Sequence, residues 1–166
     1  MLSCLNRKLK LRSRMHLGVS FNRNRKLDLF GPGEWIDEPD QVLFNHEHVT
    51  CEVIRHSNGF LIGLCRLPKD HSWSCEPLQK IKVEVHGKKF IFKTVNEEYV
   101  GFSCDMVGDV IPSWNCKDKL IHQVLDCMEV DEERKEAVYR NLAFVSDQCR
   151  KLADQIIDAS SRNEIM

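Results

Sequence analysis

Four residues between positions 71 and 109 carry side chains that could do chemistry, namely His71, His86, Cys104 and Asp109. Each lies where a strand-like run meets a proline, a glycine or a loop, and folds commonly present groups to ligands at such places. Imidazole titrates near neutral pH and a carboxylate can orient it, so the two histidines and Asp109 suit acid, base or ligand roles. We expect these four side chains to meet at one rim of a sheet.

The sequence around these residues matches no standard nucleophile, metal or cofactor template. Cys104 follows Phe102 in an apolar run, where a thiol is normally inert. A structural role for the histidines and Asp109 is the alternative, because such side chains often bond loop backbone. The lack of a template favours a binding protein over an enzyme, and it predicts no cofactor.

Lysines surround His86 in the sequence, and two of them, Lys88 and Lys89, follow it within three positions. Ammonium groups in such number suit a phosphate-bearing ligand, and a solvated sheet face is the alternative. The predicted ligand-binding residues are therefore His71, His86, Lys88, Lys89, Cys104 and Asp109.

The chain contains eight cysteines, which bear on metal binding and on redox state. No Cys-x-x-Cys pair occurs among them, and several lie inside apolar runs. This pattern predicts reduced, buried thiols and no metal site. The cysteines are Cys4, Cys51, Cys65, Cys75, Cys104, Cys116, Cys127 and Cys149.

Residues 1–30 form a predicted basic arm, because eight basic and no acidic residues lie between Met1 and Leu27. Such an arm can contact nucleic acid weakly through residues 7–26, or bind an acidic partner. A transit peptide or a solvated tail is the alternative, and we expect the arm to be dispensable for folding. No run of about 18 apolar residues occurs, so we predict no membrane span and a cytoplasmic location.

Residues 31–160 are predicted to form one α+β domain, β-rich over 31–118 and helical over 119–160. Asn58-Gly59 favours a tight hairpin turn, and we expect the strands to form a small antiparallel meander. Alternating apolar and polar residues predict about six strands, over residues 41–46, 49–55, 60–67, 80–86, 89–94 and 99–104.

The C-terminal segment predicts a long helix, because apolar residues recur at steps of four and three from residue 132 to residue 159. We expect this apolar stripe to pack on the sheet. Self-association through the stripe, giving a homo-oligomer, is the alternative. The stripe consists of Val138, Leu142, Val145, Cys149, Leu152 and Ile156.

Several short motifs follow one another along residues 33–157, and together they resemble an uncharacterised family of small proteins from tailed phages and prophages. The resemblance implies an α+β fold and a phage setting, and no activity. A His and a Cys of the family fall on Phe60 and Ile62 here, so any His/Cys centre of the family is incomplete in this chain. The motifs are Asp37-Glu-Pro-Asp40, Pro68-x-x-His71, Val85-His-Gly87, Gly101-Phe-x-Cys104, Gly108-Asp109, Tyr139-x-x-Leu142 and Cys149-x-x-Leu152.

The resemblance, the lysines around His86 and the lack of a catalytic template favour a phage-encoded accessory protein that acts by binding. Its partner would be a host protein or a phosphate-bearing nucleotide signal, as for an antagonist of host defence. One alternative is a small hydrolase or nuclease that uses His71, His86 and Asp109. The other is a nucleic-acid-binding protein that uses the basic arm.

Overall fold

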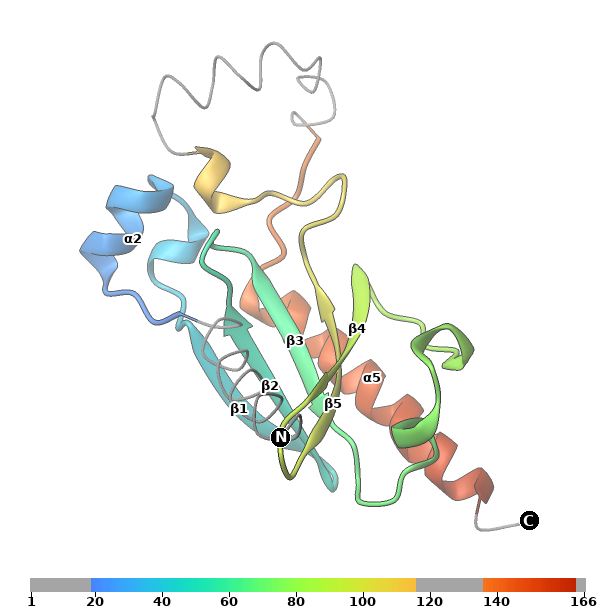
Figure 1. The fold of residues 1–166 in the computed structure, drawn as a ribbon. Coiled ribbons are helices and arrows are strands. Elements are labelled where there is room, and N and C mark those ends of the chain that lie inside the picture. The colour runs from blue at the N-terminus through green and yellow to red at the C-terminus, as the bar shows by residue number, and fades with distance from the viewer. Residues whose placement is uncertain (1–18, 116–135, 164–166) are drawn as a thin grey trace, which may run out of the picture.

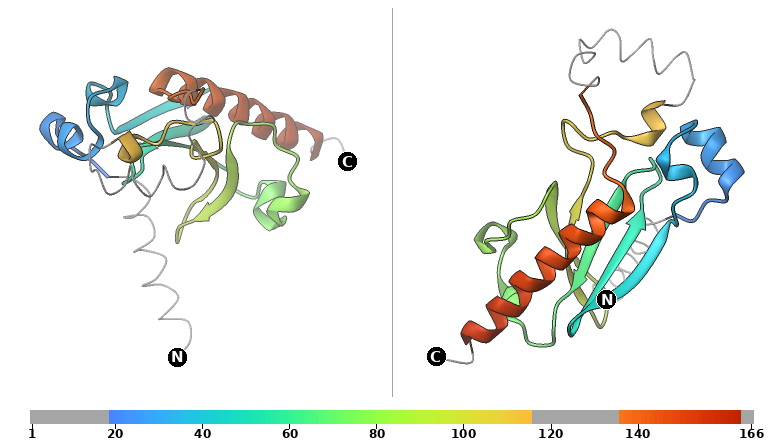
Figure 2. Two further views of the ribbon diagram at one scale, coloured as in Figure 1. Left: turned by 90° about the horizontal axis from the view of Figure 1, so that it is seen from above. Right: turned by 180° about the vertical axis from the view of Figure 1, so that it is seen from behind.

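The computed structural model describes residues 19–115 and 136–163. In this part of the chain, five antiparallel strands form one sheet, and a long C-terminal helix lies across one of its faces (Figures 1 and 2). The predicted α+β class is confirmed, with five strands where about six were expected. None of the described helices is long and apolar enough to cross a membrane.

The strands are β1 (Gln41–His46), β2 (Val49–Arg55), β3 (Leu61–Arg66), β4 (Lys88–Lys93) and β5 (Glu98–Ser103). The helices are α2 (Arg23–Phe30), α5 (Leu142–Asn163) and the 3-10 helices η1 (Glu34–Ile36), η2 (Ser72–Cys75), η3 (Leu78–Lys80) and η4 (Pro112–Asn115). The sheet order is β1-β2-β3-β5-β4, so β5 lies between β3 and β4. The simple meander was therefore wrong. Residues 67–87 connect β3 to β4, which lies two strand positions away, and β5 pairs between them.

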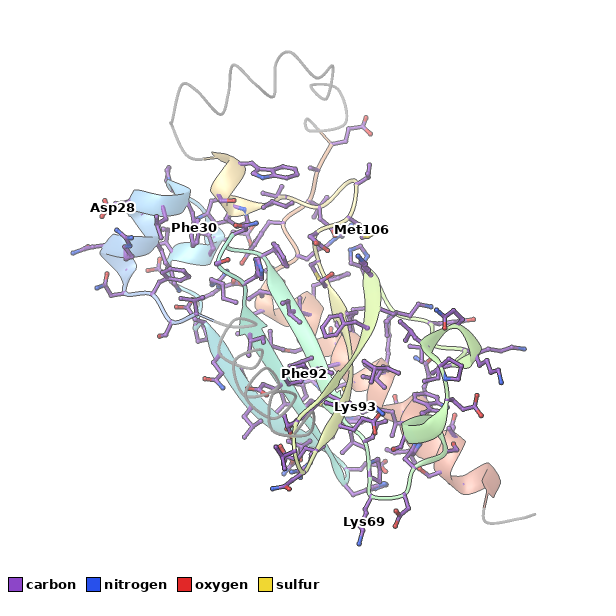
Figure 3. All side chains as sticks on the ribbon, viewed as in Figure 1. Asp28, Phe30, Lys69, Phe92, Lys93 and Met106 are labelled. Atoms are coloured by element: carbon purple, nitrogen blue, oxygen red, sulfur yellow. The ribbon has the colours of Figure 1, made fainter. Side chains whose placement is uncertain are left out.

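The ends of the strands form two rims of the sheet. One rim holds the ends of β2 and β5 and the starts of β1, β3 and β4, and the other holds the β1–β2 and β4–β5 turns and the end of β3. We call them the Arg55 rim and the Arg66 rim, after the last residues of β2 and β3. In Figure 3, Phe30 and Met106 lie toward the Arg55 rim, and Lys69 lies at the Arg66 rim.

The main core lies between α5 and the sheet, where the helix packs on β2 and β3. Val145, Cys149, Leu152 and Ile156 of the apolar stripe are all 0% exposed. Burying one such aliphatic side chain stabilises a fold by about 1.5–3 kcal/mol. The predicted packing of the stripe on the sheet is confirmed for these residues, whereas Val138 lies before the helix and is 51% exposed.

Helix α5 begins at Leu142, because two side chains satisfy its first amide groups. The Asn141 side chain accepts a hydrogen bond from the Phe144 N–H at 3.1 Å, as helix N-caps do. A carboxylate oxygen of Glu38 accepts from the Leu142 N–H at 2.8 Å, which places negative charge at the positive end of the helix. The prediction of helix over residues 119–160 is thus wrong for 136–141, and residues 116–135 lie outside the described residues.

Residues 81–86 were predicted as part of a strand, and they do not pair with the sheet. Apolar side chains of this segment do point inward at every second residue, since Ile81 and Val83 are buried. The backbone of the segment, however, forms hydrogen bonds with α5. The Glu84 N–H donates to Gln155 Oε1 at 2.7 Å, and Gln155 Nε2 donates back to the Glu84 carbonyl at 3.1 Å. The His86 N–H donates to the side chain of Gln148 at 3.0 Å. The alternation of apolar and polar residues correctly predicted which side chains of this segment are buried. Its backbone hydrogen bonds go to glutamine side chains of α5 and not to a neighbouring strand.

Residues 19–30 belong with the folded part of the chain and not with a separate basic arm. The Val19 N–H donates to the Arg55 carbonyl at 2.9 Å. Helix α2 buries Lys26 and Phe30, which are 3% and 1% exposed. The Gly-Pro-Gly segment at residues 31–33 is a turn inside the fold, so the sequence boundary at residue 30 lies too late in the chain. Residues 1–18 lie outside the described residues.

Candidate functional site

His86 and Asp109 meet at the Arg55 rim, one just before β4 and the other in the loop after β5. His86 Nε2 lies 2.9 Å from Oδ1 and 2.8 Å from Oδ2 of Asp109. Gly87 turns the chain from His86 into β4 with a φ of 83°, and a Cβ atom there would lie 1.9 Å from the Ser103 carbonyl oxygen. Only glycine fits so close a turn. The structure therefore brings together the histidine and the carboxylate that the sequence singled out.

Arg140 completes this cluster, and the sequence analysis missed it. Its Nε donates to Asp109 Oδ1 at 2.8 Å. The Asp109 side chain is 1% exposed, whereas those of His86 and Arg140 are 23% and 25% exposed. The ring of Phe144 lies against both, 5.2 Å from the His86 ring and 4.8 Å from the Arg140 guanidinium. Arg140 lies between Val138 and Leu142 of the apolar stripe, and nothing in that pattern indicates which strand loop it would face.

The loop that holds Asp109 is fixed by its own backbone. Asp109 forms an isolated parallel bridge with Val138, in which the Val110 N–H donates to Val138 and the Val138 N–H donates to Gly108. The Met106 N–H also donates to Asp109 Oδ2, at 3.1 Å. A buried carboxylate is tolerated only with such partners, and here it has a backbone amide, an arginine and a histidine. We call His86, Asp109 and Arg140 the rim cluster.

Cys104 lies at the same rim, but its thiol is not available for chemistry. The residue is 1% exposed, and its N–H donates to the Leu61 carbonyl at 3.1 Å. Burial and the nearby Asp109 charge raise the pKa of the thiol above its ordinary value. A neutral, buried thiol is neither a nucleophile nor a ligand. Asp105, on the same loop, adds an exposed carboxylate that accepts from Ser103 Oγ at 2.6 Å.

His71 does not join the rim cluster, so the predicted site of four convergent side chains is wrong for this residue. It follows β3, which runs toward the Arg66 rim, whereas His86 and Asp109 lie at the Arg55 rim. His71 is 5% exposed, its Nδ1 accepts from the Trp73 N–H at 3.1 Å, and its Nε2 lies 3.1 Å from the Ile156 carbonyl oxygen. Since a carbonyl only accepts, Nε2 carries the proton. His71 joins η2 to α5 and has a structural role.

The lysines near His86 in sequence separate in space. Lys88 is exposed at the Arg55 rim, opposite Ser103 in the register. Lys89 donates to the Val83 carbonyl at 2.6 Å. Lys93 lies at the Arg66 rim, 2.5 Å from a carboxylate oxygen of Glu98. Of the predicted lysines, Lys88 alone lies at the Arg55 rim, but strand alternation places its side chain on the sheet face of Phe90 and Phe92, away from α5 and the rim cluster.

Lys89 instead borders a shallow hollow of about 750 Å³ between residues 79–84 and α5. Lys82 and Lys151 also line it, and the carboxylate of Glu84 faces the same space. Two of these lysines are exposed and the third is bonded to backbone. The hollow is a solvated face of mixed charge.

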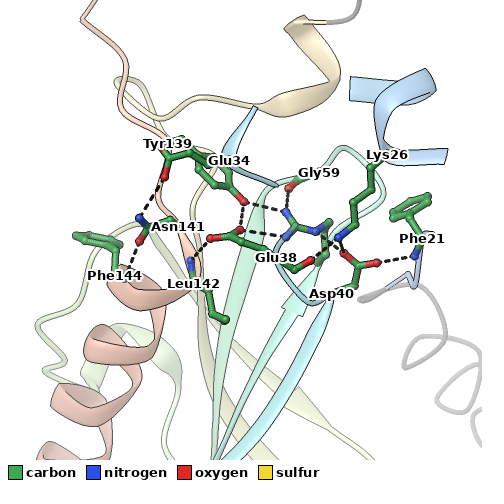
Figure 4. Close-up of polar contacts among 11 residues, drawn as sticks. Phe21, Lys26, Glu34, Glu38, Asp40, Gly59, Tyr139, Asn141, Leu142 and Phe144 are labelled. Atoms are coloured by element: carbon green, nitrogen blue, oxygen red, sulfur yellow. Dashed lines mark hydrogen bonds and ion pairs between the residues drawn. The ribbon is translucent and has the colours of Figure 1, made fainter. Parts of the chain in front are cut away.

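A second polar network lies on the Arg55 rim, next to the rim cluster (Figure 4). Arg55 is 0% exposed, and its guanidinium donates to four acceptors. The acceptors are Asp40 at 2.7 Å, the Gly59 carbonyl at 2.7 Å, Tyr139 Oη at 2.9 Å and Glu38 at 3.2 Å. Tyr139 Oη in turn donates to Glu38 at 2.6 Å. The Asp37-Glu-Pro-Asp40 motif thus supplies both carboxylates of a structural network.

The charges in this network are well matched. Burial acts to lower the pKa of Arg55, but Tyr139, Asp40 and Glu38 outweigh it and the pKa is raised, so the guanidinium stays charged. Burial raises the pKa of Tyr139, so its hydroxyl keeps the proton that it donates to Glu38. A buried ion pair depends on every member, and removing one leaves an uncompensated charge. The network joins α2, the start of β1 and the start of α5.

Part of the basic segment proposed to contact nucleic acid, residues 7–26, faces acids of its own chain. Arg23 Nε donates to Asp37 at 2.9 Å. Lys26 Nζ lies 2.7 Å from Asp40 Oδ1, with both side chains about fully buried. Lys26 is therefore held inside the fold, whereas the Arg23 and Asp37 side chains are 68% and 77% exposed. Residues 7–18 lie outside the described residues.

A wider cleft of about 850 Å³ lies at the opposite, Arg66 rim. Its walls are the loop after β3 and the β4–β5 turn, and His71 closes one side. Two of its basic side chains pair with acids of the lining, Arg66 with Glu97 at 2.8 Å and Lys93 with Glu98 at 2.5 Å. The cleft is therefore lined by charges of both signs.

No family model, curated protein or solved structure matches the chain. The resemblance to the phage family therefore stays a prediction. In the part of the chain that the structure describes, no group of three or more His, Cys, Asp or Glu side chains is arranged to hold a metal ion.

Proposed function

We propose that the protein acts by binding, as an accessory protein of a phage or prophage, and that the rim cluster takes a phosphate-bearing ligand. The observation that carries this proposal is the convergence of His86 and Arg140 on the buried carboxylate of Asp109. The three residues come from three distant segments and are held in place by backbone contacts. Groups held in this way suit recognition, because little side-chain entropy is lost when a ligand arrives.

The donors that Asp109 leaves unused belong to the Arg140 guanidinium, and they suit a phosphate. Among the described residues, only Nε of the Arg140 guanidinium and Nε2 of the His86 ring are hydrogen-bonded. The terminal nitrogens of Arg140 lie on a side chain that is 25% exposed, and the neighbouring His86 side chain is 23% exposed. Arginine and lysine groups form strong charge-assisted hydrogen bonds with phosphate oxygens.

The ligand class that follows is a nucleotide, and the phage setting implied by the resemblance suggests a nucleotide signal of host immunity. A host protein that presents a phosphate or carboxylate to the same groups is the other partner we propose. Phe144, which lies under both His86 and Arg140, gives the cluster an apolar wall.

Calorimetric titration with mononucleotides and with cyclic di- and trinucleotides tests the proposal. We expect one class to bind, with Arg140→Ala weakening the affinity by about tenfold or more, as loss of a charged hydrogen bond predicts, and with His86→Ala weakening it as well. Lys69→Ala is the matched control, because Lys69 is an exposed lysine of the opposite rim. Equal affinities in all variants would remove the rim cluster from the binding site. A lowered melting temperature of His86→Ala with unchanged affinity would make the cluster purely structural.

A second candidate is a small hydrolase, and the His86–Asp109 pair is the observation that favours it. A carboxylate on Nε2 leaves Nδ1 to take a proton from water, as a general base does. Water would be the nucleophile, since the Cys104 thiol is buried and neutral. Hydrolysis of an activated phosphodiester that is abolished in His86→Ala and kept in Lys69→Ala would favour catalysis over binding alone.

A further inference from the structure

Three thiols meet in the core between the sheet and α5, away from both polar networks of the Arg55 rim. They belong to Cys51, Cys65 and Cys149, each 0% exposed. The sulfur atoms of Cys51 and Cys65 lie 3.6 Å apart. The Cys149 carbonyl accepts from the Cys65 thiol at 3.3 Å, and the Cys51 thiol points to the same oxygen at 3.9 Å.

Cys51 and Cys65 face each other directly across β2 and β3. Opposed residues of antiparallel strands have Cα atoms about 4.5–5.5 Å apart. A disulfide spans Cα distances of about 4.4–6.8 Å and needs sulfurs about 2.05 Å apart. The backbone spacing is therefore already suitable, and rotation about the Cα–Cβ bonds brings the sulfurs together.

We propose that Cys51 and Cys65 form an oxidation site, at which a peroxide-class oxidant closes a disulfide across the two strands. In the first step, the Cys51 sulfur loses its proton and attacks one peroxide oxygen. The O–O bond breaks, a sulfenic acid forms on Cys51, and the second oxygen leaves as water. In the second step, the Cys65 sulfur attacks the Cys51 sulfur, the S–O bond breaks, and a second water leaves with the Cys65 proton. The two electrons reduce the peroxide.

The neighbours of the two thiols support this division of roles. The hydrogen bond with Cys65 lowers the pKa of Cys51, against the opposing effect of burial. Hydrogen bonds with Cys149 and Cys51, together with burial, raise the pKa of Cys65. Since the thiolate is the nucleophile, Cys51 attacks the oxidant and Cys65 resolves the sulfenic acid.

Closing the disulfide also changes the contact between the sheet and α5. Both thiol protons are lost, and with them the contacts to the Cys149 carbonyl. Because the pair is fully buried, the oxidant enters when α5 opens locally from the sheet, and the rate of oxidation reports that opening.

Peptide mapping of the oxidised full-length protein tests the proposal. Native protein is treated with hydrogen peroxide, alkylated in denaturant with iodoacetamide and digested with trypsin without a reductant. Trypsin cleaves after Arg55, which lies between the two cysteines, so a disulfide links peptides 27–55 and 56–66. We expect this linked species, two hydrogens lighter than the sum of its peptides, to appear with loss of alkylation at both cysteines.

Two variants sharpen the result. In Cys65→Ser, the Cys51 sulfenic acid should persist and react with dimedone, whereas Cys104→Ser should form the linked peptides as the wild type does. Circular dichroism confirms that each variant is folded. Full alkylation of Cys51 and Cys65 after peroxide treatment of the native protein would overturn the proposal. A disulfide to Cys149 in place of the Cys51–Cys65 bond, or oxidation that needs denaturant, would do the same.

Discussion

At the scale of single residues, this protein is marked by buried charges that occupy one rim of its sheet. Arg55 and the side chain of Asp109 are 0% and 1% exposed, and each gathers partners from segments far apart in sequence. Taking an ion from water costs several kcal/mol, which such partners must offset. The two residues differ in what surrounds them. The partners of Arg55 are largely enclosed, whereas those of Asp109 reach solvent, and that is why we place the ligand at Asp109.

Replacing Arg55 tests how far the fold depends on its network. Arg55→Met should lower the free energy of unfolding by about 3–5 kcal/mol, because Asp40 and Glu38 lose their shared cation inside the protein. Arg66→Met is the matched control, since Arg66 also ends a strand and pairs with a glutamate, but its side chain is 44% exposed. Its loss should cost less than about 1 kcal/mol. Urea denaturation measures both, and equal losses would contradict the assigned role of Arg55.

The buried acids Cys65, Cys104 and Tyr139 predict a loss of stability at alkaline pH. Their pKa values are raised in the folded state, Cys65 chiefly by the hydrogen bond with Cys149 and the other two chiefly by burial. Above the ordinary thiol value of 9.0, the unfolded thiols ionise while the folded ones keep their protons. The free energy of unfolding should then fall by about 1.4 kcal/mol per pH unit for each of the two thiols, and Tyr139 adds to the decline only above its ordinary value of 10.0.

Urea titrations at pH 7.5, 9 and 10 measure this decline. Cys104→Ala should show a shallower decline than the wild type, because one of the two thiols that titrate in this range is gone. A free energy of unfolding that stays constant over this range would show that these groups ionise equally in both states.

At the scale of elements, α5 organises the molecule through two faces. One face is the apolar stripe on β2 and β3, and the other carries Gln148 and Gln155, which bond the backbone of residues 81–86. These bonds hold His86 at the end of that segment, within reach of Asp109. The helix therefore sets the position of the rim cluster as well as the core.

Removing one glutamine should loosen residues 81–86 without unfolding the protein. Gln155→Ala deletes the two hydrogen bonds to Glu84, so the Glu84 amide should exchange with solvent about tenfold faster, as loss of about one net hydrogen bond predicts. Lys151→Ala changes an exposed residue one helical turn away and should leave this rate unchanged. Amide exchange followed by NMR gives both rates. Unchanged exchange in Gln155→Ala would mean that other contacts fix the segment.

At the scale of the whole molecule, the first described residues close the fold at the Arg55 rim. The Phe21 N–H donates to Asp40 Oδ2 at 2.5 Å, and Lys26 reaches the same carboxylate. Phe30 packs with Trp35 and Ile36 in a small core of their own. The N-terminal segment, the Asp37–Asp40 motif and the start of α5 thus depend on one another.

Truncation at two positions distinguishes this segment from the residues before it. A protein that starts at residue 31 should lose at least about 3 kcal/mol of unfolding free energy, since it lacks Phe30 and the Lys26–Asp40 pair. A protein that starts at residue 19 should keep the stability of the full chain. Thermal melts and urea titrations measure both. Equal stability of the two truncated proteins would return residues 19–30 to a dispensable arm.

Local patterning in the sequence determined the elements of this protein and much of its core. Alternation predicted β1 to β5, and the apolar stripe predicted α5 and its packing, because burial repeats with the period of each element. The sequence singled out the motif at Asp37–Asp40 and the turn at His86. It did not indicate which residues form hydrogen bonds and ion pairs with them.

Tertiary structure alone decided those partners, because they come from contacts between distant segments. The order β1-β2-β3-β5-β4 sends His71 to one rim and His86 to the other, a choice that strand patterns do not contain. The same tertiary arrangement brings Arg140 to Asp109 and Tyr139 to Arg55. It also places residues 81–86 beside α5 and not beside a strand. A backbone amide can be satisfied by a glutamine side chain as well as by a neighbouring strand, so the sequence pattern does not distinguish the two.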